Sequence, residues 1–263
     1  MFIIGEKINT SIKGIEEAVK RQDAAFIQDI AREQVASGAN MLDVNVGTRI
    51  HTEPDDMKWI VKVIQEVVDV PFCIDSPNPE AIEAGLSECK SKAMVNSITA
   101  EEKRVEEILP LLKRFNPRIV ALTMDDKGIP EDVEKRYNIA EKLIEILTRT
   151  GVRLEDIYID TLVRPIGTDS KSGLVVLESI KTIMNSFKGV HTICGLSNVS
   201  FGLPKRGLLN RAFLLMAIAM GLDAVIMDPL DKEMMSAVRA GEAILGNDEY
   251  CTEYLTSFRQ GKL

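Results

Sequence analysis

The sequence has 263 residues, 45% of them hydrophobic, which is enough to bury a sizeable core within one large domain. The 40 Asp and Glu residues outnumber the 32 Lys and Arg residues, and the net charge of −8 argues against a broad surface for nucleic acid or an anionic membrane. The four cysteines form no CxxC pair, so they suggest neither a zinc site nor a disulfide framework. Charged residues come too early for a signal peptide and no apolar run is long enough to cross a membrane. We therefore expect a cytoplasmic protein with small or locally recognised ligands.

Short apolar runs alternate with longer stretches of helical period along the chain, in eight successive pairs. The expected strands are 2–9, 41–47, 71–76, 93–99, 118–125, 156–163, 191–195 and 224–229. The expected helices are 24–37, 54–68, 79–89, 104–115, 132–150, 173–187, 208–220 and 232–245, with a final helix within 248–260 packed outside them.

This alternation predicts a (β/α)8 TIM barrel. Runs such as 119–122 and 224–227 are apolar at consecutive positions, as in parallel strands that are covered on both faces. Gly38, Gly151 and Gly221 are placed to end helices, and no linker divides the chain, so we expect one domain over residues 1–263. An open doubly wound sheet is the alternative, but the glycine-rich turn that would follow its first strand is absent.

Functional residues of a barrel lie at the carboxyl ends of its strands, and here nearly every strand ends in a carboxylate or a carboxamide. The two histidines lie elsewhere, so a catalytic triad or a histidine-based metal site has little support. The polar residues at the strand ends are Glu6, Asn9, Asp43, Asn45, Asp75, Asn96, Asp125, Asp160, Asn198 and Asp228.

Two kinds of ligand suit this set of side chains. Carboxylates accept paired N–H donors and Asn both donates and accepts, so the set could read the edge of a planar heterocycle such as a pterin. The same carboxylates could instead hold a divalent cation. Taken singly, Asp75, Asn96 or Asn198 could be an ordinary turn or capping residue, and only their recurrence indicates a shared site.

Two further patterns concern the surroundings of this site. Seven cations, including Lys7, Arg49 and Arg206, fall in loops after strands, which predicts a locally basic mouth suited to an anionic tail of the ligand. Residues 212–220 are apolar nearly all round, which predicts a helix buried on two sides, either by a dimer mate or by the C-terminal tail.

Eight short segments, spread from end to end of the chain, together resemble the pterin-binding methyltransferases that work with corrinoid proteins. These include the methyltetrahydrofolate:corrinoid/iron-sulfur protein methyltransferases. The segments are Ile4-Gly5-Glu6-Lys7-Ile8-Asn9, Leu42-Asp43-Val44-Asn45, Ile74-Asp75-Ser76, Val95-Asn96-Ser97, Tyr158-Ile159-Asp160, Gly195-Leu196-Ser197-Asn198-Val199-Ser200, Asn210-Arg211 and Ile226-Met227-Asp228.

The resemblance implies a pterin-binding barrel that moves a methyl group between N5 of tetrahydrofolate and cobalt. Asp75, Asn96 and Asp160 would bind the pterin ring, and Asn198 would act at N5. Gly195, Ser197 and Arg206 would lie near Asn198, whereas Glu6, Asn9, Asp43 and Asp228 are weaker candidates.

The resemblance also implies partners. The corrinoid (cobalamin) would arrive on a separate protein that docks at the barrel mouth, the enzyme would be a homodimer, and the chain itself would bind no metal. One departure is Phe201, where the acetogenic relatives are expected to carry Gln, so the corrinoid partner and the original methyl donor stay open.

Three other functions remain as alternatives. Dihydropteroate synthases share the barrel, but their Gly-Gly-Glu-Ser-Thr-Arg-Pro and Ser-Arg-Lys segments are replaced here by 46–50 and 197–199. A metal-dependent aldolase or hydrolase would use the aspartates as ligands. A folate-binding subunit without catalysis would keep only the ring contacts.

Overall fold

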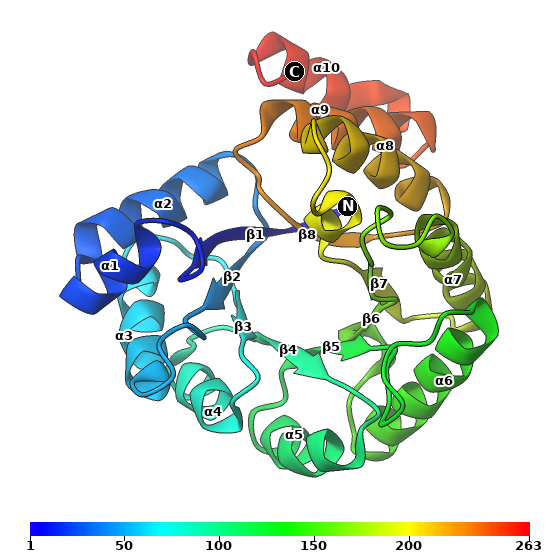
Figure 1. Ribbon diagram of the computed structural model, residues 1–263. Coiled ribbons are helices and arrows are strands. Elements are labelled where there is room, and N and C mark those ends of the chain that lie inside the picture. The colour runs from blue at the N-terminus through cyan, green and yellow to red at the C-terminus, as the bar shows by residue number, and fades with distance from the viewer.

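The computed structural model describes residues 1–263, and its centre is a ring of eight parallel strands (Figure 1). The strands are β1 (Phe2–Asn9), β2 (Met41–Asn45), β3 (Phe72–Asp75), β4 (Met94–Ile98), β5 (Arg118–Leu122), β6 (Ile157–Asp160), β7 (His191–Ile193) and β8 (Ala224–Met227). Their order in the sheet is β7-β6-β5-β4-β3-β2-β1-β8. The ring closes irregularly between its two end strands, where the Ile226 N–H donates to the Cys194 carbonyl at 3.0 Å.

Helices surround this ring and connect successive strands (Figure 1). They are α1 (Ile15–Arg21), α2 (Ala24–Ala36), α3 (Glu53–Gln65), α4 (Pro79–Glu88), α5 (Glu102–Phe115), α6 (Val133–Arg149), α7 (Ser172–Ser186), α8 (Arg206–Ala219), α9 (Lys232–Ile244) and α10 (Thr252–Arg259). Three short 3-10 turns also occur, at Leu154–Asp156, Leu196–Ser200 and Glu249–Cys251. The predicted (β/α)8 barrel is confirmed.

Most of the expected elements are found with small differences at their ends. Gly38, Gly151 and Gly221 adopt positive φ at helix ends, as predicted. The fifth strand ends at Leu122 rather than at 125, because Asp125 forms a tight turn in which its carbonyl accepts from the Gly128 N–H at 2.8 Å. The short helix α1 was not expected.

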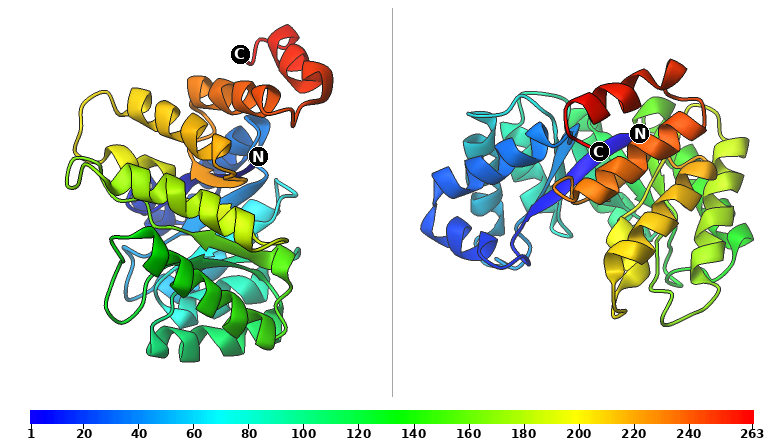
Figure 2. Two further views of the ribbon diagram at one scale, coloured as in Figure 1. Left: turned by 90° about the vertical axis from the view of Figure 1, so that its right-hand side faces the viewer. Right: turned by 90° about the horizontal axis from the view of Figure 1, so that it is seen from above.

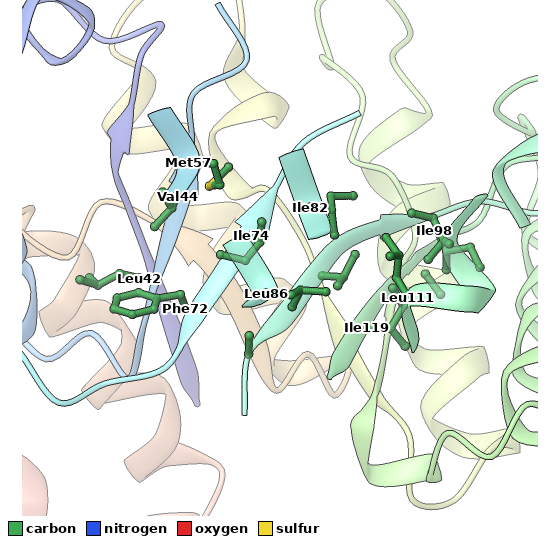
Figure 3. Packing of buried hydrophobic residues seen from close by; sticks show 14 of the residues in the cluster. Leu42, Val44, Met57, Phe72, Ile74, Ile82, Leu86, Ile98, Leu111 and Ile119 are labelled. Atoms are coloured by element: carbon green, nitrogen blue, oxygen red, sulfur yellow. The ribbon is translucent and has the colours of Figure 1, made fainter. Parts of the chain in front are cut away.

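Two layers of apolar side chains stabilise the barrel. In the outer layer, residues of the strands such as Leu42, Ile74 and Ile119 pack against residues of the helices such as Ile82 and Leu111 (Figure 3). In the inner layer each strand contributes one side chain to a cluster, and this cluster fills the barrel interior. Its members are Ile4, Met41, Cys73, Met94, Val120, Tyr158, Ile193 and Ala224.

Of the two predicted coverings of α8, the C-terminal tail does not supply the second one. Helix α10 lies outside the barrel, as expected, but it packs beside α9 (Figure 2). Within this chain only one face of α8 is buried, because Leu208, Leu215 and Met216 are 62%, 38% and 48% exposed. The apolar residues of 212–220 therefore leave a free apolar face. None of the helices combines the length and hydrophobicity needed to cross a membrane.

Candidate active site

The carboxyl ends of the strands open into a cavity of about 580 Å³, within the usual size range of small-molecule sites. Ten of the residues singled out from the sequence line it. They are Glu6, Asn9, Asp43, Asp75, Asn96, Asp160, Gly195, Ser197, Asn198 and Arg206. Ser11, Ile12, Phe201 and Ile226 complete the lining.

Two strand-end aspartates lie outside this lining. Asp228 accepts from Lys7 Nζ at 2.9 Å and from the Leu230 N–H at 2.9 Å. Asp125 caps its own turn by accepting from the Lys127 N–H at 2.9 Å. Both side chains therefore have a structural role, which is usual for a polar residue that follows a strand.

Asp75 and Asn96 lie side by side because the register of β3 and β4 pairs them directly. The Asn45 amide donates to Asp75 at 2.8 Å and fixes one carboxylate oxygen. Burial raises the pKa of Asp75, while the Asn45 hydrogen bond and the Arg104 guanidinium lower it. The other carboxylate oxygen of Asp75 can therefore accept a hydrogen bond from a ligand, at a position that water reaches poorly.

One guanidinium holds the carboxyl end of β4 and the loop after β3. Arg104, from α5, donates to the carbonyls of Ser97, Pro77 and Ser76 at 2.9, 2.7 and 3.0 Å. These three carbonyls come directly after Asn96 and Asp75 in the chain. Arg104 therefore positions both residues without lining the cavity itself.

Asp160 ends β6, which only β5 separates from β4, and it is 9% exposed. Its Oδ1 accepts from the Leu162 N–H at 2.7 Å. Burial raises the pKa of Asp160 to about 6, although the Leu162 N–H and the charge of Arg136 oppose the shift. The buried Arg136 donates to the carbonyls of Thr161 and Pro130 and so holds the loop after β6 in place.

Asp43 lies deeper, with its side chain 3% exposed and its Oδ1 without a hydrogen-bond partner. Burial, and secondarily the charge of Asp75, raise its pKa well above the usual range. Asp43 therefore presents a buried carboxyl group with one unpaired oxygen to the cavity.

Asn198 lies on the short turn Leu196–Ser200 after β7. The absence of a side chain at Gly195 leaves room for it, since a Cβ there would lie 3.2 Å from Asn198 Nδ2. Arg206 fixes the turn by donating to Ser200 Oγ at 3.0 Å and to the Ser197 carbonyl at 2.6 Å. The amide of Asn198 makes no side-chain hydrogen bond within the chain and is free to meet a ligand.

The predicted basic mouth is only partly present. Lys7 is paired with Asp228, and Arg49 Nε donates to Asp56 at 2.7 Å. Arg206 is the one cation in the lining of the cavity. No group of three or more His, Cys, Asp or Glu side chains is arranged to hold a metal ion.

Sequence reasoning missed the residues that support the site from outside. Asn45 was noted only as a strand end, although its spacing of two from Asp43 places both on one face of β2. No local sequence pattern marks Arg104 or Arg136 as a site residue, because the backbone carbonyls that they bind lie elsewhere in the sequence.

Known proteins resemble this chain over most of its length. Residues 6–228 match the family described as pterin binding enzyme. A methylcorrinoid:tetrahydrofolate methyltransferase of Eubacterium limosum is 38% identical over 265 residues, covering 100% of this chain and 98% of that protein. A methionine synthase of Mycobacterium tuberculosis is 32% identical over 86% of this chain, which spans only 20% of that longer protein.

Solved structures resemble the fold. A dihydropteroate synthase from Clostridium difficile, crystallised with pteroic acid, superposes with a TM-score of 0.71 at 21% identity, covering 93% of this chain and 96% of that one. A Yersinia pestis dihydropteroate synthase gives a TM-score of 0.70 at 12% identity, covering 92% and 94%. At this identity the likeness concerns the barrel alone.

Proposed function

Because this chain belongs to the family of pterin-binding enzymes, we propose that it transfers a methyl group between a separate corrinoid protein and N5 of tetrahydrofolate. The full-length similarity to a methyltransferase with this pair of substrates supports the proposal. The observation that carries it is the shared cavity, in which the acceptors Asp75 and Asp160 and the amides Asn96 and Asn198 line one space at the barrel mouth.

These side chains suit the edge of a pterin. Its 2-amino-4-oxo edge alternates N–H donors with a carbonyl acceptor, so the carboxylates of Asp75 and Asp160 accept and the Asn96 amide can donate or accept. The ring then fills the cavity, and its N5 side faces the turn that carries Asn198.

The transfer is a displacement at carbon. The lone pair of N5 attacks the methyl carbon, the cobalt–carbon bond breaks with both electrons staying on cobalt, and Co(III) becomes Co(I). Positive charge develops on N5 until its proton leaves. The Asn198 carbonyl can accept from the charged N5–H and its NH₂ can donate to neutral N5, so Asn198 can follow the charge in either direction.

Dihydropteroate synthesis is the second candidate because of the shared fold. That reaction expels diphosphate, which requires cations beside the leaving group. Arg206 is already engaged by the turn that it fixes, and Arg49 is paired with Asp56. The methyltransferase function therefore fits the charges of this cavity better.

The test compares products directly. The purified protein is incubated without oxygen with a methylated corrinoid and tetrahydrofolate, and 5-methyltetrahydrofolate is measured by chromatography. A parallel reaction supplies a pterin diphosphate and p-aminobenzoate. We expect methylated folate and no dihydropteroate. The reverse result would establish the second candidate, and folate binding without either product would indicate a non-catalytic subunit.

The proposal includes a homodimer and a cytoplasmic location. The exposed apolar residues Leu208, Leu215 and Met216 lie on one face of α8, and a second copy of the chain would bury them. The four cysteines are all free thiols, which is usual for cytoplasmic proteins. Light scattering should give the mass of a dimer, and Met216→Lys should reduce it to that of one chain. A wild-type protein with the mass of one chain would refute the dimer.

The corrinoid protein would dock over the open mouth, where cobalt can approach N5. Phe201 lines the cavity, is 67% exposed and lies 5.9 Å below the Arg206 guanidinium, so its ring is available to such a partner.

A further inference from the structure

Glu6 is a carboxyl group of the cavity that the proposed pterin contacts leave unused. It lies on β1, near the carboxyl end of the strand, and lines the same cavity as Asn198. Only β8 separates its strand from β7, after which the Asn198 turn follows, and Ile226 of β8 also lines the cavity. Glu6 is half-buried and has no hydrogen-bond partner within the chain.

The charged groups around Glu6 are one ion pair and two further side chains. Lys7 Nζ binds Asp228 Oδ2 at 2.9 Å, and this ion pair lies beside Glu6. Arg206 from α8 and the buried Asp43 from β2 are its other charged or titratable neighbours.

The balance of these effects puts the titration of Glu6 at neutral pH. Burial first, and then the charge of Asp228, raise the pKa of Glu6 to about 7, against the smaller opposing effects of Lys7 and Arg206. A group that titrates near the working pH can take up and return a proton at low cost.

The transfer reaction can use such a group. When N5 of tetrahydrofolate forms its bond to the methyl carbon, the proton on N5 must leave, and in the reverse direction it must return. The Asn198 amide can follow the charge but cannot hold the proton. Asp75 and Asp160 are occupied by the pterin edge, and the guanidinium of Arg206 does not give up its proton.

We propose that Glu6 exchanges the N5 proton during methyl transfer, an assignment that rests on the proposed methyltransferase function. As tetrahydrofolate is methylated, the Glu6 carboxylate takes the proton that N5 releases. When 5-methyltetrahydrofolate reacts with Co(I), the protonated Glu6 returns it to N5 as the carbon–nitrogen bond breaks.

The test is the pH profile of a single turnover, followed by the cobalt absorbance from about pH 6 to 8 with tetrahydrofolate and a methylated corrinoid. The wild-type rate should rise with pH and show a midpoint close to the pKa of Glu6. Glu6→Gln should be slower by about 10²–10⁴-fold and lack this midpoint, with the dissociation constant of tetrahydrofolate within about twofold of wild type. The exposed Glu33→Gln on α2 is the matched control and should behave as wild type.

A second variant tests the same role without removing the carboxyl group. Asp228→Asn takes away the anion beside Glu6 and should move the midpoint to lower pH. A Glu6→Gln variant that keeps the wild-type rate and midpoint, or an Asp228→Asn variant whose midpoint does not move, would overturn the role of Glu6. A wild-type protein that binds tetrahydrofolate but never changes the cobalt spectrum would instead overturn the proposed function.

Discussion

Replacing Asn198 with alanine should separate catalysis from binding. The absence of a side chain at Gly195 and the two hydrogen bonds of Arg206 hold the turn that carries the amide, so at the proposed position beside N5 it would need little reorganisation when charge develops. A preorganised hydrogen bond of this kind contributes about 3–4 kcal/mol to transition-state stability, or roughly 10²–10³ in rate. Asn198→Ala should therefore slow the single-turnover rate by that factor and change the dissociation constant of tetrahydrofolate by less than about threefold.

Asp75→Ala gives the opposite pattern. It removes a charged acceptor for the pterin edge that is worth roughly 1.5–3 kcal/mol, so the dissociation constant should rise by about 10–150-fold, with a smaller loss of rate for the bound complex. Rapid-mixing spectroscopy gives the rates and calorimetry the affinities, with Asn138→Ala on the exposed surface of α6 as control. Equal losses of rate and affinity in both variants would refute this division of roles.

The remaining predictions concern support, pH and the core. Arg104→Ala should raise the KM for tetrahydrofolate about tenfold with kcat nearly unchanged, because it frees the loops after Asp75 and Asn96. Lys113→Ala, at an exposed position of the same helix, should have no effect, and an equal fall in kcat for Arg104→Ala would contradict a positioning role. In the proposed binding mode the pterin edge donates to ionised Asp160, whose pKa is raised to about 6, so affinity should fall about tenfold per pH unit below that value. Titration calorimetry of Asp160→Asn should show weaker binding that lacks this step near pH 6. Ile74→Ala should lower the free energy of unfolding in urea by about 2–5 kcal/mol, whereas Ile244→Ala, at an 82% exposed position, should change it by less than about 0.5 kcal/mol.

The barrel could be predicted because each of its units repeats the same physical pattern. Buried parallel strands such as 119–122 are apolar at consecutive positions, and glycines such as Gly151 end helices where positive φ is needed. Helix α1 escaped prediction because it has only seven residues and no side-chain N-cap, so the local sequence carries little signal.

The candidate site was predictable only as far as strand ends can be recognised. Positions at or near the carboxyl ends of strands predicted that Asp75, Asn96 and Asp160 lie around one site, and all three line one cavity. The same rule also predicted Asp125 and Asp228 as site residues, but Asp125 stabilises a turn and Asp228 forms an ion pair with Lys7. The sequence alone does not fix the direction of a side chain that follows the end of a strand.

The apolar pattern of α8 shows a related limit. Its composition predicted burial on two sides, but only one side is covered within the chain. A sequence pattern reports that a face is apolar, and it does not report which molecule covers that face.

The claim at the centre of this account is that the barrel mouth binds a pterin and places its N5 beside Asn198. A crystal structure with 5-methyltetrahydrofolate tests this most directly. We expect the 2-amino-4-oxo edge on Asp75, Asn96 and Asp160, N5 within hydrogen-bond distance of Asn198, and the methyl group facing the open mouth. A pterin bound elsewhere, or one whose N5 points away from Asn198, would contradict the account.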